Sequence, residues 1–480
     1  MANSFHTDVA VIGAGLAGLA AANRAAQEGL SVTVFEKSAD EAYLCNSRYT
    51  GGLFHIAMDD MAADPAWMKA NLERTTRGST DTALAEALTQ NARRTLRWLS
   101  SLGVRFIQAG PDGLRRNALA PPGVRQTGLN WKGRAGDVMV RTLGARVQSR
   151  AGRILRGMAA QQLLMEGGRC VGVQVRTAAG ETQDRRADAV VIADGGFQAN
   201  PVLLRRFITP HPERLLQRNA QSGEGTGLLM AEAVGAKLVG TDSFYGHIQH
   251  RRAMTDPALW PYPVLDSLAT GGIVVDGAGR RFCDEGLGGV YVTNAIARLP
   301  DPLSVVIVFD DATWNGPGKD WLLPANPYLL SAGGNVVSAD SLEALARKLQ
   351  MDPTALQDTV AGYHRVLEGQ LVAGQPARSA QPYKPWPVRQ APFHAVEVCA
   401  GITYTMGGIA TDAQARVLDA NDQPISGLYA AGACTGGLEG GGGAAGYSGG
   451  LSKSGVFGML AGEAIVAARA GTGCKEAVHV

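Results

Sequence analysis

Hydrophobic and polar positions follow two different periods along the first 40 residues. Asp8–Ile12 is a short run of apolar and β-branched residues, and an alanine-rich stretch with helical spacing follows from Gly18 to about Glu28. Ser31–Phe35 is a second β-rich run, and it ends at Glu36. Short apolar runs are typical of strands and a 3.6-residue spacing is typical of helices. The pattern therefore predicts a strand–helix–strand unit at the start of the chain.

The same periods predict further elements downstream. Helical patterns are expected over Pro65–Leu102, Gly133–Ala145, Leu228–Val234 and Leu451–Arg469. Strands are expected over Cys170–Arg176, Ala187–Ala193, Gly272–Asp276 and Pro424–Gly432, with Met406–Asp412 and Ala415–Asp419 as a pair. Between about residues 237 and 403 prolines, tryptophans and histidines become frequent. This change of texture predicts a second domain inserted into the first.

Composition and charge narrow the class of protein. Of 480 residues, 45% are apolar, and this length suits two or three globular domains. The net charge is only +2 and no basic run occurs, so a nucleic-acid partner is not expected. The apolar run Val9–Ala22 is shorter than a membrane span, and no signal segment precedes Asp8. Six cysteines lie far apart without a CxxC pair, so no metal site is expected. We expect a cytoplasmic protein without a membrane span.

Glycine is unusually frequent, with 62 residues, and the glycines cluster. Gly13, Gly15 and Gly18 form a G-x-G-x-x-G pattern between the first strand and its helix. In such a turn the first glycine permits the tight bend, the second lets backbone approach a pyrophosphate and the third lets helix and strand pack closely. Glu36 is placed to accept both hydroxyls of an adenosine ribose. The unit predicts a dinucleotide site; the motif alone leaves FAD and NAD open, and its position at the start of a long chain favours FAD.

Further motifs follow this unit in order along nearly the whole chain. They are Asn46-Ser47 with Thr50-Gly51-Gly52, Ala193–Phe197, Gly223–Gly227, Gly279–Glu285, Thr405–Gly408, Gly427–Gly432 and Phe457-Gly458. Together with Gly13–Gly18 and Glu36, these motifs resemble the fumarate reductase/succinate dehydrogenase flavoprotein family. Two of the segments, Gly401–Thr405 and Arg281–Gly286, look most like its tricarballylate dehydrogenase branch.

The resemblance implies an α/β fold with an α+β cap. A Rossmann-like FAD-binding domain would be formed from both chain ends, residues 1–238 and 404–480, with a capping domain over residues 239–403 inserted between them. The FAD would be noncovalent, because Asn46 and Ser47 stand where covalent attachment would need a histidine. The cofactor-binding residues that it implies are Gly13, Gly15, Leu16, Ala17, Gly18, Glu36, Lys37, Asn46, Ser47, Thr50, Gly51, Gly52, Ala193, Asp194, Gly195, Gly432, Ala433, Gly449, Gly450, Leu451 and Ser452.

The implied reaction is hydride exchange between flavin N5 and a substrate carbon, which forms or reduces a C=C bond while a side chain handles the proton. Gly289 and Ala445 stand where fumarate reductases of the family place arginines, and Thr403 stands in place of a histidine. A simple dicarboxylate would lack its bidentate partners. We therefore expect an organic acid or a cyclic enone-like substrate rather than fumarate. Ala433 stands where relatives often have a glutamate for the flavin ribityl chain.

Four residues are candidates for the chemistry: His247, Tyr291, Tyr404 and Tyr447. His247 lies near the position of a substrate-binding histidine in the family, and His250 competes with it. Tyr291 suits the vacated acid role only if neighbouring positive charge lowers its pKa. Tyr404 and Tyr447 are expected to line the cleft.

Other charged and aromatic residues receive structural roles or stay open. Arg280 and Arg281 are expected to pair with Asp284 and Glu285 at the hinge. Trp260, Tyr262 and Trp386 are expected in the core of the cap. Lys453 either faces the flavin or points to solvent.

Two other functions are open alternatives to a dehydrogenase or reductase. One is an oxidase or hydroxylase that uses O2, and the other is a non-catalytic flavin-binding subunit. The expected partners are a small-molecule substrate and an unknown electron acceptor or donor. A membrane-associated redox partner stays open.

Overall fold

The computed structural model describes residues 5–110, 116–124, 131–150, 152–320, 323–440 and 446–476. Its largest sheet has eight strands, and five of them form a parallel core in the order β20-β10-β1-β2-β7. The core strands are β1 (His6–Ile12), β2 (Val32–Glu36), β7 (Gly152–Arg156), β10 (Thr182–Ile192) and β20 (Pro424–Ala430). Strands β8 (Met158–Glu166), β9 (Arg169–Thr177) and β19 (Arg416–Leu418) extend the sheet. Because β20 lies against β10, segments far apart in sequence complete one sheet.

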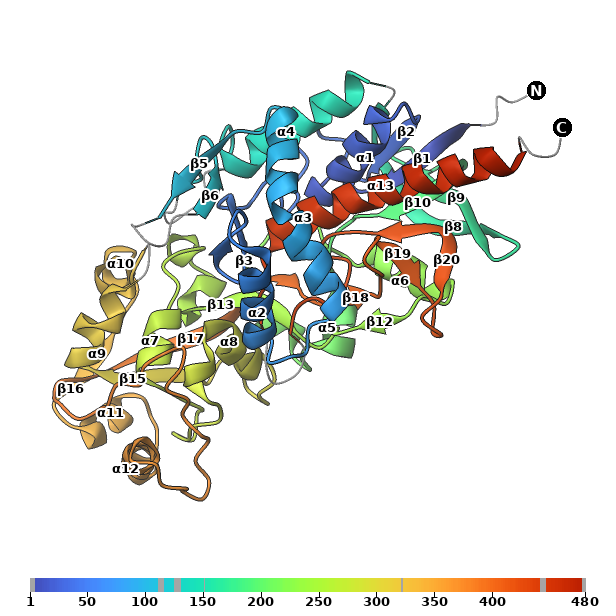
Figure 1. Cartoon of the computed structure of the whole chain (residues 1–480). Coiled ribbons are helices and arrows are strands. Elements are labelled where there is room, and N and C mark those ends of the chain that lie inside the picture. Colours follow the sequence, from blue (N-terminus) through green and yellow to red (C-terminus); the bar gives the residue numbers. More distant parts are fainter. Residues whose placement is uncertain are drawn as a thin grey trace.

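Helices cover one face of this sheet (Figure 1). They are α1 (Leu16–Gln27), α3 (Thr82–Ser101), α4 (Ala135–Gln148) and α13 (Gly450–Glu476). Small residues let α1 and α13 lie close together: a Cβ at Gly458 would be 2.4 Å from the Ala17 carbonyl oxygen. The β8–β9 hairpin and α6 (Thr226–Ala233) pack on the opposite face. The turn at Gly15, where α1 begins, is therefore fixed in place at the carboxyl end of β1.

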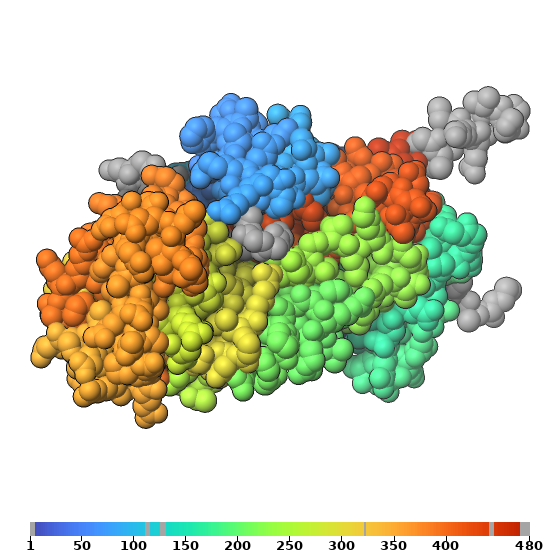
Figure 2. Space-filling view, turned by 90° about the horizontal axis from the view of Figure 1, so that it is seen from below, coloured from blue at the N-terminus to red at the C-terminus, as the bar shows by residue number. Residues whose placement is uncertain are grey.

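A second sheet of six strands forms the cap. Its strands are β11 (Leu216–Gln217), β13 (Phe244–His250), β14 (Ile273–Val275), β15 (Val306–Asp310), β16 (Val337–Ala339) and β17 (Phe393–Thr405). Its helices are α7 (Asp266–Gly271), α8 (Gly289–Ala297), α9 (Asp311–Asn315), α10 (Ala325–Ser331), α11 (Leu342–Lys348) and α12 (Pro353–Leu367). This sheet begins before the predicted boundary at residue 239 and ends just past the one at 403, and the domain limits stay a prediction. Figure 2 shows an elongated molecule with the later part of the cap at one end and the C-terminal segment toward the other.

Smaller elements connect these two parts. They are α2 (Pro65–Thr75), α5 (Pro201–Phe207), β3 (Leu53–Ile56), β4 (Asp59–Asp60), β5 (Phe106–Ala109), β6 (Arg116–Leu119), β12 (Leu238–Val239) and β18 (Gly408–Ile409). Short 3₁₀ turns are η1 (Pro212–Arg214), η2 (Arg251–Met254), η3 (Pro257–Leu259), η4 (Glu285–Leu287) and η5 (Pro317–Lys319). Strands β3 to β6 form their own sheet.

The predicted pairing of residues 406–412 with 415–419 is present over the short stretch of residues 410–412 and 416–418. β18 pairs with β12, and β19 pairs with β20. The two segments meet at a bridge between Thr411 and Val417, and the Leu418 amide donates to the Ala410 carbonyl oxygen at 3.0 Å. The short turn between the segments therefore closes a small hairpin, and each segment also pairs with a more distant strand, β12 or β20.

Candidate active site

A long pocket passes the carboxyl ends of β1, β2 and β10 and reaches the N-terminus of α13. At one end it is lined by Gly13, Gly15, Leu16 and Ala17. Gly13 has a φ of +96°, and a Cβ there would lie 2.7 Å from the Ala193 carbonyl oxygen. Helix α1 has no side-chain cap at Gly15, so its first turn offers N–H groups and positive dipole to an anion in the pocket.

Glu36 closes the same end of the pocket from the last position of β2. Its Oε2 accepts a hydrogen bond from the Ala14 amide at 3.3 Å, and its Oε1 accepts one from the Ser38 amide at 3.0 Å. Burial raises the pKa of the Glu36 carboxyl, and these amides oppose the rise. Lys37 lies 2.8 Å from Glu224 at the more exposed side of the lining.

The loop after β2 connects the pocket to the cap. Asn46 donates from Nδ2 to the Thr403 carbonyl oxygen at 2.9 Å and accepts from the Ala220 amide at 3.0 Å. The Ser47 hydroxyl accepts from the Leu16 amide at 3.0 Å, at the start of α1. Asn46, Ser47 and Thr50 all line the pocket. This loop therefore joins the first turn of α1 to the cap strand that carries Thr403.

Asp194 carries an unused acceptor in the pocket wall. Its Oδ2 accepts from the Gly227 amide at 2.7 Å, whereas its buried Oδ1 has no hydrogen-bond partner among the described residues. Burial raises the pKa of this carboxyl to about 6. Buried polar atoms are nearly always paired, so this oxygen indicates a missing ligand group. Ala193 and Gly195 line the same wall.

The opposite end of the pocket is aromatic and cationic. Tyr404, Tyr447, Ala433, Gly450, Leu451 and Lys453 line it. Lys453 is buried; its Nζ donates to the Thr435 carbonyl oxygen at 2.9 Å and lies 3.2 Å from Glu439 Oε2. The Tyr404 hydroxyl donates to Glu439 Oε1 at 2.6 Å. Lys453, which the sequence left open, therefore points inward, beside the N-terminus of α13.

These features fit FAD. The open N-terminus of α1 suits its pyrophosphate, the carboxylate of Glu36 suits its ribose hydroxyls and the unpaired Asp194 oxygen suits another polar group along the chain. The aromatic end with Lys453 and the α13 dipole would hold the isoalloxazine ring. Bound there, FAD supplies hydride chemistry.

The remaining predicted cofactor residues stand outside the lining. They are Gly18, Gly51, Gly52, Gly432, Gly449 and Ser452. Two of them serve close packing: a Cβ at Gly18 would lie 2.0 Å from the Gly13 carbonyl oxygen, and one at Gly449 would lie 2.1 Å from that of His55. Their contact with FAD stays a prediction.

His247 belongs to a chain of hydrogen bonds at the cleft. His247 Nδ1 lies 2.7 Å from Asp266 Oδ2, and His247 Nε2 lies 2.9 Å from the Tyr245 hydroxyl. The Tyr245 ring stacks on Tyr447, with 3.7 Å between the ring centroids. Burial raises the pKa of Tyr245 well above 10. The structure thus brings His247, Tyr404 and Tyr447 together, with Tyr245 between them. His250 is also buried, but its Nε2 faces the Asn335 amide, so it belongs to another part of the cap.

Gly289, where the resemblance expected an arginine, makes room for Asp266. A Cβ at Gly289 would lie 2.3 Å from the Asp266 carboxyl carbon. The carboxylate is also fixed by the Ile248 amide, which donates to Oδ1 at 2.9 Å. A larger residue at position 289 would displace the partner of His247. Ala445, the second position compared with an arginine, lies outside the described residues.

Tyr291 lies at the edge of this cluster and does not meet its predicted condition. Its pKa is raised by burial and by the nearby Cys283 and Asp284, rather than lowered by positive charge. Its acid role remains a prediction that the electrostatics do not favour.

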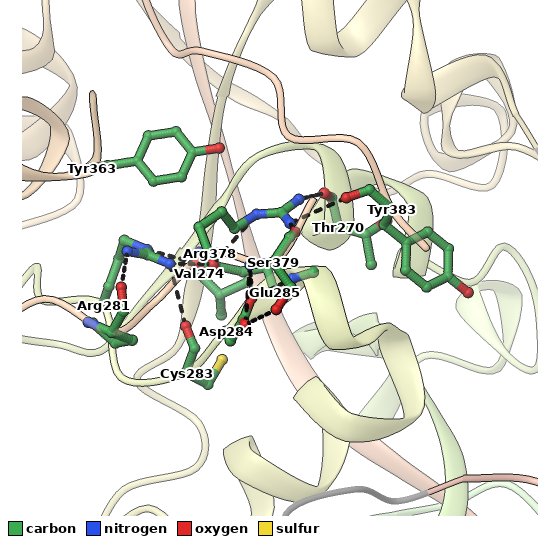
Figure 3. Close-up of polar contacts among 12 residues, drawn as sticks. Thr270, Val274, Arg281, Cys283, Asp284, Glu285, Tyr363, Arg378, Ser379 and Tyr383 are labelled. Atoms are coloured by element: carbon green, nitrogen blue, oxygen red, sulfur yellow. Dashed lines mark hydrogen bonds and ion pairs between the residues drawn. The ribbon is translucent and has the colours of Figure 1, made fainter. Parts of the chain in front are cut away.

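The hinge segment next to Tyr291 forms a buried polar network (Figure 3). Arg281 donates from Nε to Glu285 Oε1 at 2.9 Å, and both side chains are fully buried. Arg378 Nε lies 3.9 Å from Glu285 Oε2. Asp284 instead accepts from the amide and hydroxyl of Ser379. The expected pairing holds for Arg281 with Glu285, and the buried pair joins the start and end of this segment.

Sequence reasoning missed several residues that the fold brings to the site. Tyr245 and His247 are two apart on β13, so strand alternation was a usable signal for placing them on one face. Asp266, Glu439 and Arg218 reach the site from other elements, and no local pattern indicated them. Trp260 packs against the apolar core of the cap, as expected, and its ring also lies 6.4 Å from that of Tyr49; Tyr262 lies under Arg218.

A family model described as an FAD binding domain matches residues 8–451. The chain belongs to this family. It is 28% identical to the NADH:fumarate oxidoreductase of Klebsiella pneumoniae over 95% of this chain and 47% of that protein, so it spans about half the length of that relative. It is 27% identical to a fumarate reductase (cytochrome) of Shewanella frigidimarina over 95% of this chain and 76% of the relative.

Solved structures of other proteins share this fold. A 3-ketosteroid Δ1-dehydrogenase from Sterolibacterium denitrificans superposes with a TM-score of 0.71 over 97% of this chain and all of that one, at 21% identity. At that identity the likeness concerns the fold. The relatives are named as oxidoreductases and reductases, and this protein is a flavoprotein of the FAD binding domain family. The tricarballylate branch stays a resemblance.

Two further properties concern the described residues as a whole. Within them, one helix is long and apolar enough to cross a membrane by length and composition, namely α13 over Gly450–Ala470 with mean hydropathy 1.2. It packs against α1 and α3, and 56% of this stretch is buried in the protein, as expected for a core helix. The sequence prediction had considered only Val9–Ala22.

The described residues contain no group of three or more His, Cys, Asp or Glu side chains that could hold a metal.

Proposed function

We propose that this flavoprotein forms or reduces a C=C bond in a small organic molecule. The observation that carries the proposal is the hydrogen-bond chain from Asp266 through His247 to Tyr245, which ends on the aromatic cluster at one end of the FAD pocket. Bound FAD supplies the hydride exchange. The protein must then move one proton at the neighbouring substrate carbon.

The hydrogen bonds of His247 fix the direction in which a proton can move along this chain of residues. An ionised Asp266 only accepts hydrogen bonds, so the Nδ1–H of His247 points to it and Nε2 accepts from the Tyr245 hydroxyl. In dehydrogenation, Tyr245 takes the substrate proton while its own proton moves to His247 Nε2. The resulting imidazolium is stabilised by Asp266. Reduction runs the same transfers in reverse, so the high pKa of Tyr245 never requires a free phenolate.

The pocket lining supports noncovalent FAD. The described lining contains no histidine, and burial raises the pKa of the lining Cys45 thiol to about 11, which keeps it a poor nucleophile. Lys453 lines the same pocket as Ala433, where the ribityl glutamate of relatives is replaced.

The substrate is an organic acid or a cyclic enone-like molecule, and not fumarate. Asp266 packs against Gly289, so the position lacks both an arginine and the space for one. The relative in Klebsiella pneumoniae is named for NADH and fumarate, and it is about twice as long as this chain. We propose that the electron acceptor or donor of this protein is a separate molecule, and that the protein is cytoplasmic.

The decisive experiment follows the flavin spectrum of the purified holoprotein without oxygen. Candidate acids and enones are added to oxidised protein, or to protein reduced with dithionite, and the flavin band near ~450 nm is recorded. Bleaching or recovery with one of them supports the proposal. Fast recovery of reduced protein in air, without a dye, would favour an O2-using oxidase. A flavin that responds to dithionite alone would indicate a non-catalytic subunit.

A further inference from the structure

An arginine that belongs to none of the motifs bonds to Thr403, next to the pocket residue Tyr404. Arg218 directly follows β11, and its amide donates to the Ile402 carbonyl oxygen at 2.8 Å. Strand β11 pairs in parallel with β17 at Gly401 and Ile402. This pairing carries the Arg218 side chain to the same strand edge as Thr403 and Tyr404.

The guanidinium of Arg218 is held by neutral groups. Nη1 donates to Thr403 Oγ1 at 3.2 Å, and Nε donates to the Pro261 carbonyl oxygen at 3.2 Å. Its central carbon lies 5.2 Å from the centre of the Tyr262 ring. None of the ion pairs formed within the described chain includes this half-buried residue. The guanidinium is a permanent cation, and among the described residues it therefore has no ion-pair partner.

The positive charge of Arg218 acts on two tyrosines of the aromatic cluster, Tyr245 and Tyr447. Burial raises the pKa of both Tyr245 and Tyr447, and the positive charge of Arg218 opposes the rise in both. The pocket residue Asn46 bonds to the Thr403 carbonyl oxygen and to the Ala220 amide, two residues beyond Arg218. Arg218 is therefore connected to the pocket residue Asn46 through Thr403.

We propose that Arg218 binds a carboxylate of the substrate. The inference rests on the proposed function, because it assumes that the substrate lies against Tyr245 and Tyr447. It deepens that function by selecting the organic acids over the neutral enones. The two N–H groups of Nη2, for which the described residues provide no bond, would donate to the carboxylate while Thr403 and Pro261 keep the guanidinium oriented.

A binding experiment separates this role from catalysis. Holoprotein is titrated with two matched pairs of probes, crotonate with crotonamide and cinnamate with cinnamamide, and the shift of the flavin absorbance reports the Kd. Each pair has one shape and differs in charge. We expect an acid of at least one pair to bind about 10-fold or more tightly than its amide, as charge-assisted bonds give.

Substitution then assigns the preference to the residue. Arg218→Gln should weaken binding of that acid by about 10- to 100-fold and leave the amide nearly unchanged. Arg218→Lys should keep part of the preference. Arg252→Gln is the matched control, because Arg252 is another cap arginine, 52% exposed at its side chain and paired with Asp256. It should bind both probes as the wild type does.

Two results would overturn the proposal. One is the absence of any acid preference in the wild type across both pairs; the other is an acid preference that survives in Arg218→Gln. If Arg218→Gln retains no flavin, the wild-type preference and Arg218→Lys still decide the question. Because these are binding measurements, they succeed or fail independently of whether flavin bleaching supports the proposed reaction.

Discussion

Lys453 Nζ lies 3.2 Å from Glu439 Oε2 in a place that solvent does not reach, with the two side chains 1% and 0% exposed. The same carboxylate accepts hydrogen bonds from Tyr404 and from the Ser448 hydroxyl at 2.8 Å. A buried ion pair of this kind is costly to break, because the remaining partner keeps an uncompensated charge. It links the N-terminus of α13 to the glycine-rich segment before it.

Replacing one partner of this pair should therefore destabilise the protein. We expect Lys453→Met to lower the free energy of unfolding by about 3–5 kcal/mol, because Glu439 stays buried and unpaired. Lys453→Met combined with Glu439→Gln should lose less than the single variant, since the charge is then removed as well. Urea unfolding of the apoproteins at pH 7 measures both. A loss under about 1 kcal/mol in the single variant would contradict a buried pair.

Two glycines of the N-terminal turn should respond differently to alanine. A Cβ at Gly15 meets only the Ser47 hydroxyl at 3.4 Å, so Gly15→Ala should fold, but its methyl group narrows the phosphate end of the pocket. A Cβ at Gly18 would collide with the Gly13 carbonyl oxygen at 2.0 Å, so Gly18→Ala should destabilise the fold itself. FAD content and the Tm of the apoproteins separate the two effects. Normal FAD retention in Gly15→Ala would argue against the phosphate site.

Asp194 predicts a specific pH dependence. Its folded pKa of about 6 lies above the ordinary value of 3.8, so the folded apoprotein binds the proton more tightly than the unfolded chain. The contribution of this group to the free energy of unfolding is fully present below about pH 4 and is lost as the pH rises through 6. Asp194→Asn should remove this loss and gain on the order of 2–3 kcal/mol relative to the wild type between pH 4 and pH 7. A difference that stays constant between these pH values would show that Asp194 does not titrate there.

Tyr245 and Tyr291 are rival proton carriers. Tyr245→Phe should slow turnover on the order of 10²-fold while leaving probe binding nearly intact, because the relay loses its terminal hydroxyl. His247→Gln should slow turnover similarly, because Tyr245 then loses the group that takes its proton. Tyr291→Phe should have little effect. The opposite pattern, a slow Tyr291→Phe and a normal Tyr245→Phe, would transfer the role to Tyr291.

The local sequence pattern was sufficient to predict site residues that lie within one strand–helix–strand unit. Gly13, Gly15 and Glu36 belong to one strand–helix–strand unit, and their pocket could be predicted from spacing. Arg218 and Thr403 are 185 residues apart and meet only because β11 pairs with β17. A single sequence contains no sign of that pairing, since β11 has only two residues.

Side-chain direction was the second limit. Whether Lys453 faces solvent depends on Glu439, which reaches it from across the glycine-rich segment. The Asp266 carboxylate depends on the absence of a side chain at Gly289, on another helix. Such relations are set by packing between elements, and residue spacing within one element does not encode them.

The shared sheet has a consequence for how this protein is made. The pocket needs α1 and β2 from the beginning of the chain, but it also needs β20 and the first turn of α13, which include residues beyond 420. The ribosome therefore releases the whole cap before the last wall of the pocket exists. During synthesis the edge of β10 that will receive β20 stays unpaired, and FAD can be captured only after the final helix has emerged.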